Sequence, residues 1–136
     1  MAFARLAAWF ATGMVIFAGC GRPAGPSTLP FNGKVVFVKG GSTKILALRE
    51  AQIEFQSVDQ PGVHAYGQIN EDGSFTLMTA KDDTGQEGAV PGTHRVRLNL
   101  DGTAEEFVAP QFQSFDTSGI TVKVPSDQPI EIKVWR

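Results

Sequence analysis

Residues 63–79, VHAYGQINEDGSFTLMT, place Asp72 and Gly73 between two runs in which apolar and polar residues alternate. Glycine adopts a positive φ without steric cost and aspartate tolerates it well, so this pair is typical of a tight turn between antiparallel strands. Because side chains alternate along a strand, we expect Phe75 and Leu77 to lie on one face of the strand and Thr76 and Met78 on the other. The stretch predicts a β-hairpin.

Alternation of the same kind, and at residues 31–39 a run of four apolar residues, predicts further strands along a single domain, residues 31–136. These strands are expected at residues 31–39, 51–56, 93–100, 120–124 and 130–134, besides the two arms of the hairpin. In the strand at 51–56, one face is expected to be buried and the other solvated; the buried set is Ala51, Ile53 and Phe55, and the solvated set is Gln52, Glu54 and Gln56. No helix is predicted in this domain.

Three segments lack a clear strand pattern. Residues 43–49 are either a short edge strand or a loop that packs its apolar side chains inward. Residues 81–92 read as a polar loop, in which Pro91 and Gly92 suit the central positions of a type II turn. Residues 103–119 have no period, but they carry four large apolar side chains whose exposure would create an adhesive patch. We therefore expect this last segment to lie against the body of the domain.

The composition agrees with an all-β class. The chain of 136 residues has 15 glycines, 8 prolines and 10 phenylalanines, and few long helix-forming runs. About seven short strands separated by turns predict a single antiparallel β-sandwich of Greek-key type. The formal net charge of −2 is small and dispersed, which argues against a nucleic-acid partner because phosphate binding needs a clustered basic face.

The N-terminus has the layout of an export signal at residues 1–19. Arg5 is followed by an apolar run over residues 6–18, and small residues come next. As a helix this run would be about 20 Å long, which is shorter than the ~30 Å hydrocarbon core of a bilayer. It is therefore expected to be a cleaved signal and not a permanent membrane span.

Cys20 is the only cysteine of the chain, so no internal disulfide can form. With Ala18 and Gly19 before it, the sequence resembles the lipobox of bacterial lipoproteins, although Phe17 stands where leucine is usual. The resemblance implies a lipid on Cys20 and a place in the cell envelope, with secretion as the alternative. Gly21 is not the aspartate associated with inner-membrane retention, which favours the outer membrane. Residues 20–30 form the expected tether.

Five short motifs follow one another through the predicted domain. They are Gly33-x-Val35, Leu48-x-x-Ala51-x-Ile53-x-Phe55, Gly67-x-x-Asn70-x-Asp72-Gly73-x-Phe75-x-Leu77, Gly88-Ala89-Val90-Pro91-Gly92-Thr93-x-x-Val96, and Thr117-Ser118-Gly119-Ile120-Thr121-x-x-Val124. In this order and spacing, the chain resembles the transthyretin-like (prealbumin-like), carboxypeptidase-regulatory-domain-like β-sandwiches of small bacterial lipoproteins. Glu50 stands where that family commonly has glycine. The resemblance implies a structural or accessory module with no cofactor and no catalytic residues.

Two kinds of chemistry could involve the polar residues. His64 and His94 are the only histidines, and the hydroxyisourate hydrolases of transthyretin fold use histidines, an arginine and a Tyr-Arg-Gly-Ser tail. This chain ends in Lys-Val-Trp-Arg instead, so a hydrolase is only a remote alternative. Oxygen ligands for calcium could come from Asn70, Asp72, Asp82, Asp83 and Glu87. Turn chemistry explains Asn70 and Asp72 without a metal, and no metal site is expected.

Tyr66 and Trp135 are out of phase with the predicted inward faces. Exposed aromatic rings can stack on sugars or anchor a protein contact. The sequence therefore predicts a non-catalytic, lipid-anchored envelope protein that acts as a structural or protein-interaction module. Its expected partners are the membrane, through Cys20, and an envelope protein or a cell-wall glycan; binding of carbohydrate is the alternative function.

Overall fold

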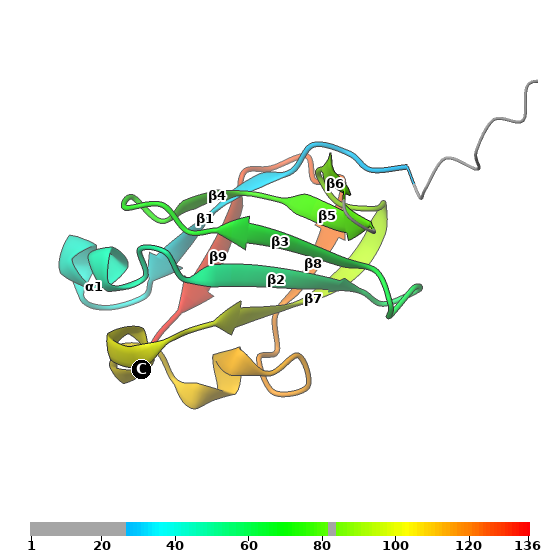
Figure 1. Cartoon of the computed structure of the whole chain (residues 1–136). Helices are drawn as coiled ribbons and strands as arrows, with labels where there is room; N and C mark the ends of the chain where they lie inside the picture. Colours follow the sequence, from blue (N-terminus) through cyan, green and yellow to red (C-terminus); the bar gives the residue numbers. More distant parts are fainter. Residues whose placement is uncertain (1–26, 82–83) are drawn as a thin grey trace, which may run out of the picture.

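The computed structural model of the chain describes residues 27–81 and 84–136, which form two β-sheets around a common core (Figure 1). The predicted signal, Cys20 and the first part of the tether lie outside these residues. The all-β class is confirmed. The described residues contain nine strands, two more than the approximate number predicted.

The smaller sheet has three strands in the order β4-β1-β9. Its strands are β1(Asn32–Phe37), β4(Ser74–Thr76) and β9(Ile130–Val134). The β1–β4 pair is antiparallel, whereas β1 and β9 are parallel, with Val35 opposite Ile132. The prediction of a purely antiparallel sandwich is therefore wrong at this pair. The reason is that the chain crosses from the larger sheet to the smaller one after β8 and enters it alongside β1, in the same direction.

The larger sheet has six strands in the order β6-β5-β3-β2-β7-β8, and all its neighbours are antiparallel. Its strands are β2(Gln52–Ser57), β3(His64–Gln68), β5(Met78–Lys81), β6(Thr84–Glu87), β7(Gly92–Asn99) and β8(Thr121–Val124). The segment at 81–92, predicted to be a polar loop, instead contributes β6 and so extends the sheet by one strand. The other predicted strands of this sheet are present at or within a few residues of their expected bounds.

The turn at residues 70–73 forms as predicted, but its two arms do not stay together. The backbone N–H of Asn70 donates to Ser74 O (2.8 Å), and that of Gly73 donates to Asn70 O (2.9 Å). The returning chain first pairs with β1 as β4, and only after Leu77 joins β3 as β5. The N–H of Leu77 donates to Phe31 O (3.0 Å), which marks the point of crossing. The continuous segment from β4 to β5 thus contributes one strand to each sheet.

The core lies between the two sheets. Phe75 and Leu77 lie on one face, as the alternation predicts, and both are buried, as are the inward residues of β2 and β7. Phe55 lies at the centre, with ring centroids 5.5 Å from Phe31 and 6.0 Å from Phe75. Each large apolar side chain of this kind contributes roughly 2 kcal/mol when it is fully removed from water.

Short helices occur where none was predicted. They are α1(Gly41–Ala47) and two 3₁₀ turns, η1(Gly102–Glu106) and η2(Pro110–Gln113). Residues 43–49 were predicted to be an edge strand or a loop, and both predictions are wrong because most of these residues belong to α1. Helix α1 has poor helix formers in its first turn and no side-chain cap, so its stability comes from tertiary contacts; the Lys44 ammonium, for instance, lies 5.7 Å from the centroid of the Phe37 ring. Residues 103–119 lie against the body as expected, with Val108 and Phe112 buried.

The N-terminal residues that the structure describes are already part of the folded body. The backbone of Leu29 exchanges two hydrogen bonds with Ala89, at 2.9 and 3.0 Å, and its side chain packs against the core. The hydroxyl of Thr28 donates to Glu87 O (2.7 Å). The chain therefore enters the domain beside the end of β6, opposite to α1 and the turn at residues 70–73 (Figure 1).

Candidate functional site

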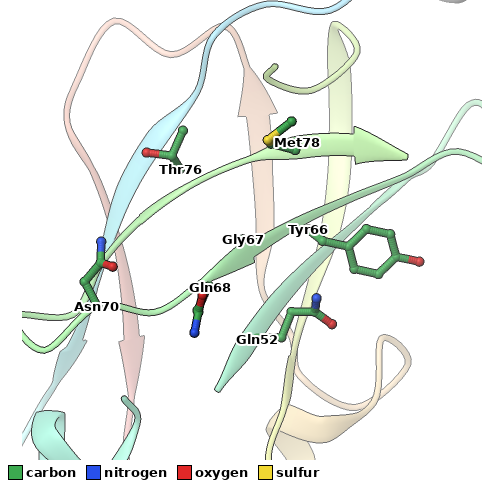
Figure 2. A pocket seen from close by; sticks show the side chains of 7 residues that line it. All are labelled: Gln52, Tyr66, Gly67, Gln68, Asn70, Thr76 and Met78. Atoms are coloured by element: carbon green, nitrogen blue, oxygen red, sulfur yellow. The ribbon is translucent and has the colours of Figure 1, made fainter. Parts of the chain in front are cut away.

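A groove of about 450 Å³ opens on the outer face of the larger sheet. The lining residues, labelled in Figure 2, are Gln52, Tyr66, Gly67, Gln68, Asn70, Thr76 and Met78; in this view the ring of Tyr66 extends away from Gly67. The groove lies where the chain after the 70–73 turn pairs with β1 before it joins β3. The switch of one strand between sheets thus creates the hollow.

Gly67 lets the strands approach closely at this point. A Cβ on Gly67 would lie 2.8 Å from the backbone oxygen of Thr76 and 3.3 Å from side-chain atoms of Ile53 and Leu77. Any larger residue would therefore push the crossing strand away. The sequence shows that residue 67 is a glycine, but only the fold shows why a larger side chain would not fit there.

Among the residues that the structure describes, none with a charged side chain lines the groove. Gln52 and Gln68 lie directly opposite each other on neighbouring strands, and their side-chain amides make no hydrogen bond with other described residues. The side-chain N–H of Asn70 donates to the Ser74 hydroxyl (3.1 Å). Amide side chains each present a donor and an acceptor, so the groove is equipped for hydrogen bonding to an uncharged ligand.

Next to the groove lies a buried carboxylate. Glu54 is only 3% exposed although it lies on the outer face of β2, so the prediction of a solvated face is wrong at this residue. Its Oε2 accepts from Arg97 Nε (2.7 Å), and its Oε1 is 2.7 Å from His64 Nδ1. Phe115, from the segment at 103–119, lies over this group. Its ring centroid is 4.7 Å from the guanidinium carbon of Arg97 and 5.8 Å from the His64 ring.

His64 contacts an oxygen acceptor at each ring nitrogen. Its Nε2 is 3.0 Å from Pro61 O, and its Nδ1 faces the Glu54 carboxylate. A doubly protonated ring donates to both, whereas a neutral ring can donate to only one. The His64 ring is also nearly parallel to the ring of Tyr66, with an interplanar angle of 16° and centroids 6.1 Å apart. These contacts connect the turn before β3, the buried carboxylate and the aromatic end of the groove.

Tyr66 is half-buried at the edge of the groove. Partial burial raises the pKa of its phenol above 10.0, and the nearby negative charge of Glu54 raises it further, while Arg97 acts in the opposite direction. The phenol therefore stays un-ionised over the physiological range. At the turn, the hydroxyl and the backbone N–H of Ser74 hold the pKa of the Asp72 carboxyl below its usual value.

The two aromatic residues singled out in the sequence do not share a site. Tyr66 lines the groove, whereas Trp135 follows β9 and packs edge-on against Phe112, with centroids 4.7 Å apart at 87°. Trp135 remains 44% exposed. A ligand in the groove would therefore contact Tyr66 and not Trp135.

The two histidines are also separated. His64 lies on the outer face of the larger sheet, while His94 is 1% exposed in the core beside Phe55. Nε2 of His94 donates to Val90 O (2.7 Å), and Nδ1 is buried without a partner among the described atoms. The fold does not bring the two imidazoles into one site.

The residues considered for calcium are not gathered either. Asn70 and Asp72 are engaged with Ser74 in the turn, and Figure 1 shows this turn and β6, which carries Glu87, at opposite ends of the sheets. Asp82 and Asp83 lie outside the described residues. Within residues 27–81 and 84–136, no three His, Cys, Asp or Glu side chains come together as a metal site requires.

The predicted anchor cannot be placed, because Cys20 lies outside the described residues. Among those that are described, no helix is long and apolar enough to cross a bilayer. A comparison of the chain with models of known families, with curated proteins and with solved structures finds no match of any of the three kinds.

Sequence reasoning identified Tyr66 but missed the other polar residues of this face. Gln52 and Gln68 occupy outward positions of predicted strands, where amides are ordinary surface residues. The Glu54–Arg97 pair depends on the register between β2 and β7. The sequence does show a carboxylate and a guanidinium at outward positions of two predicted strands. It does not show that the two strands are neighbours in a register that places these residues opposite each other.

Proposed function

We propose that the chain is a non-catalytic protein of the cell envelope, anchored by a lipid on Cys20 after export, and that it acts as a structural or protein-interaction module. The observation that carries this proposal is the outer face of the larger sheet. Its groove offers amides, a hydroxyl and an aromatic ring. The imidazole beside it, His64, already faces an oxygen partner at each ring nitrogen. This chemistry favours binding over reaction.

The anchor and the domain are close in sequence. Cys20 precedes Ser27, the first described residue, by seven positions, which is at most about 25 Å of extended chain. A lipid on Cys20 would therefore keep the sheet face within reach of components at the membrane surface. Each buried methylene of an acyl chain contributes ~0.8 kcal/mol, so two or three chains hold a small domain firmly.

The anchor is tested by cell fractionation of Cys20→Ser. We expect this variant to leave the membrane pellet and appear in the soluble fraction, because the acyl chains have no other attachment point on the chain. Gly21→Asp is the matched control: it should stay in the pellet and move toward the inner membrane. A Cys20→Ser protein that remains fully in the pellet would contradict the lipid anchor.

A second candidate function, carbohydrate binding at the cell wall, is favoured by the position of Tyr66 beside the amide-lined groove. Aromatic rings and amides are the side chains that engage the apolar faces and the hydroxyls of sugars. Retention of the full chain on isolated cell-wall material, measured in pulldowns, separates this function from a protein-contact role.

A further inference from the structure

We propose that the groove around Gly67 binds an uncharged saccharide, with Gln52 and Gln68 as its main hydrogen-bonding residues and Tyr66 as its stacking wall. This inference rests on the carbohydrate-binding candidate and specifies its site and ligand class. It starts from the observation that none of the seven described residues that line the groove carries a charge.

The two glutamines form a cross-strand pair. Gln52 on β2 and Gln68 on β3 are direct partners in register, so their side chains leave the same face about 5 Å apart at the Cβ atoms. Neither amide is engaged by another described residue. A planar amide presents a donor and an acceptor side by side, which is the pattern that meets two adjacent hydroxyls of a sugar ring. Thr76 adds a hydroxyl on the opposite wall (Figure 2).

Tyr66 supplies the apolar contact. Tyr66 lines the groove, and one face of its ring is turned toward His64, which lies nearly parallel to it. Because Glu54 and Pro61 in turn hold His64, the Tyr66 ring is positioned before a ligand arrives, which reduces the entropy lost on binding. Met78, which is 47% exposed on the other wall, offers a second apolar surface for the C–H groups of a sugar.

The charges around the groove favour a neutral ligand. The Glu54 carboxylate is compensated by Arg97 and contacted by His64. Beyond Asn70, the turn carries Glu71 and Asp72. The Glu71 carboxylate is paired with Arg49 at 3.0 Å, but an acidic sugar would meet no compensating cation among the described residues of the lining. We therefore expect uronic acids to bind more weakly than neutral sugars of the same length.

Calorimetric titration of the detergent-solubilised full chain tests the proposal. The probes are cellotetraose and chitotetraose, which are uncharged, and tetragalacturonate, which is charged; glucose and N-acetylglucosamine show whether a polymer or a free sugar is preferred. We expect at least one uncharged probe to bind, and tetragalacturonate to bind about tenfold more weakly or not at all.

Variants locate the binding to the groove. We expect Gln68→Ala and Tyr66→Ala each to weaken binding about fivefold, and Tyr66→Phe to retain most of it because the ring is kept. The matched controls are Trp135→Ala, the exposed aromatic residue elsewhere, and Gln111→Ala, an exposed glutamine on η2; both should bind like the unmodified chain. Gln68 is exposed, so its replacement should not unfold the domain.

Three results would overturn the proposal: absence of binding for every uncharged probe, tighter binding of tetragalacturonate, or equal losses for Trp135→Ala and Tyr66→Ala. Membrane localisation of Cys20→Ser is measured without any sugar. A failure of the saccharide site is therefore distinguishable from a failure of the envelope-anchored module.

Discussion

Glu54 organises the residues that surround it on the outer sheet face. Its carboxylate accepts from Arg97 and faces His64, and the ring of Phe115 covers the side chains of both. A buried carboxylate is costly unless it is paired, so these residues depend on one another. Because His64 in turn lies parallel to Tyr66, the position of the groove's aromatic ring depends on a residue that does not line the groove.

Replacing this carboxylate should weaken the fold. We expect Glu54→Gln to lower the free energy of unfolding by about 2 kcal/mol, because it leaves Arg97 without a counter-charge; the estimate is below that for a fully buried pair since Arg97 is partly exposed. Glu131→Gln, at an exposed position of β9, is the control and should change stability by less than about 0.5 kcal/mol. Urea unfolding measures both, and equal effects would argue against a structural role for the pair.

Glu54→Gln should also change the pKa of Tyr66, which is the only tyrosine of the chain. The pKa of the Tyr66 phenol is raised in the folded protein. The contribution of Tyr66 to the free energy of unfolding is therefore full below about pH 10, and it is lost as the pH rises through the pKa of the folded state. We expect Glu54→Gln to lower this pKa part of the way toward 10.0, since burial, the larger cause, remains. Absorbance of the phenolate during a pH titration measures it, and an unchanged midpoint would show that Glu54 does not act on Tyr66.

Glu50 has a backbone conformation that favours glycine. Its φ is 69°, in the left-handed region where a Cβ costs roughly 1 kcal/mol. We expect Glu50→Gly to raise the free energy of unfolding by about 1 kcal/mol. Glu50→Ala is the control: it removes the carboxylate but keeps the strain, and it should be close to neutral. If alanine stabilised as much as glycine, charge and not backbone strain would be the cause.

At the scale of elements, alternation predicted most strands, because a sheet with one buried face imposes a period of two. It could not predict the crossing at Leu77, since burial alternates without interruption through β4 and β5 and the change of partner depends on a hydrogen bond to Phe31. Helix α1 was missed because its seven residues include poor helix formers and no side-chain cap. Among the groove residues, Tyr66 could be singled out from the sequence as an outward-facing aromatic residue. The pairing of Gln52 with Gln68 could not, because it depends on the register of the sheet.

The turn that joins β3 to β4 should tolerate almost no change at Gly73. Its φ is 87°, and an added Cβ would lie 2.4 Å from the backbone oxygen of Val35. We expect Gly73→Ala to cost about 2 kcal/mol or more, from the left-handed conformation and the clash with backbone. Gly62→Ala is the matched control, because a methyl group there would have no neighbour within 4 Å and the φ of Gly62 is not positive. Similar melting temperatures for the two variants would contradict this account.

At the scale of the whole molecule, the chain passes between the two sheets four times: through α1 between β1 and β2, at the turn between β3 and β4, at Leu77 between β4 and β5, and between β8 and β9. The groove lies beside the crossing at Leu77. The N-terminal residues enter the domain beside β6, at the end away from α1 (Figure 1). The all-β class and two-sheet arrangement followed from the sequence pattern, whereas the parallel β1–β9 pair is a long-range contact that no local pattern specifies.

Photo-crosslinking in intact cells tests the central claim most directly, namely that the domain acts by making contacts at the envelope through the outer face of its larger sheet. A photoreactive residue is placed at position 68, in the groove, and in a second protein at Lys133, which is exposed on β9 of the other sheet. The account predicts that position 68 gives a specific adduct with an envelope component and that position 133 gives none. Adducts from position 133 alone, or from neither position, would contradict it.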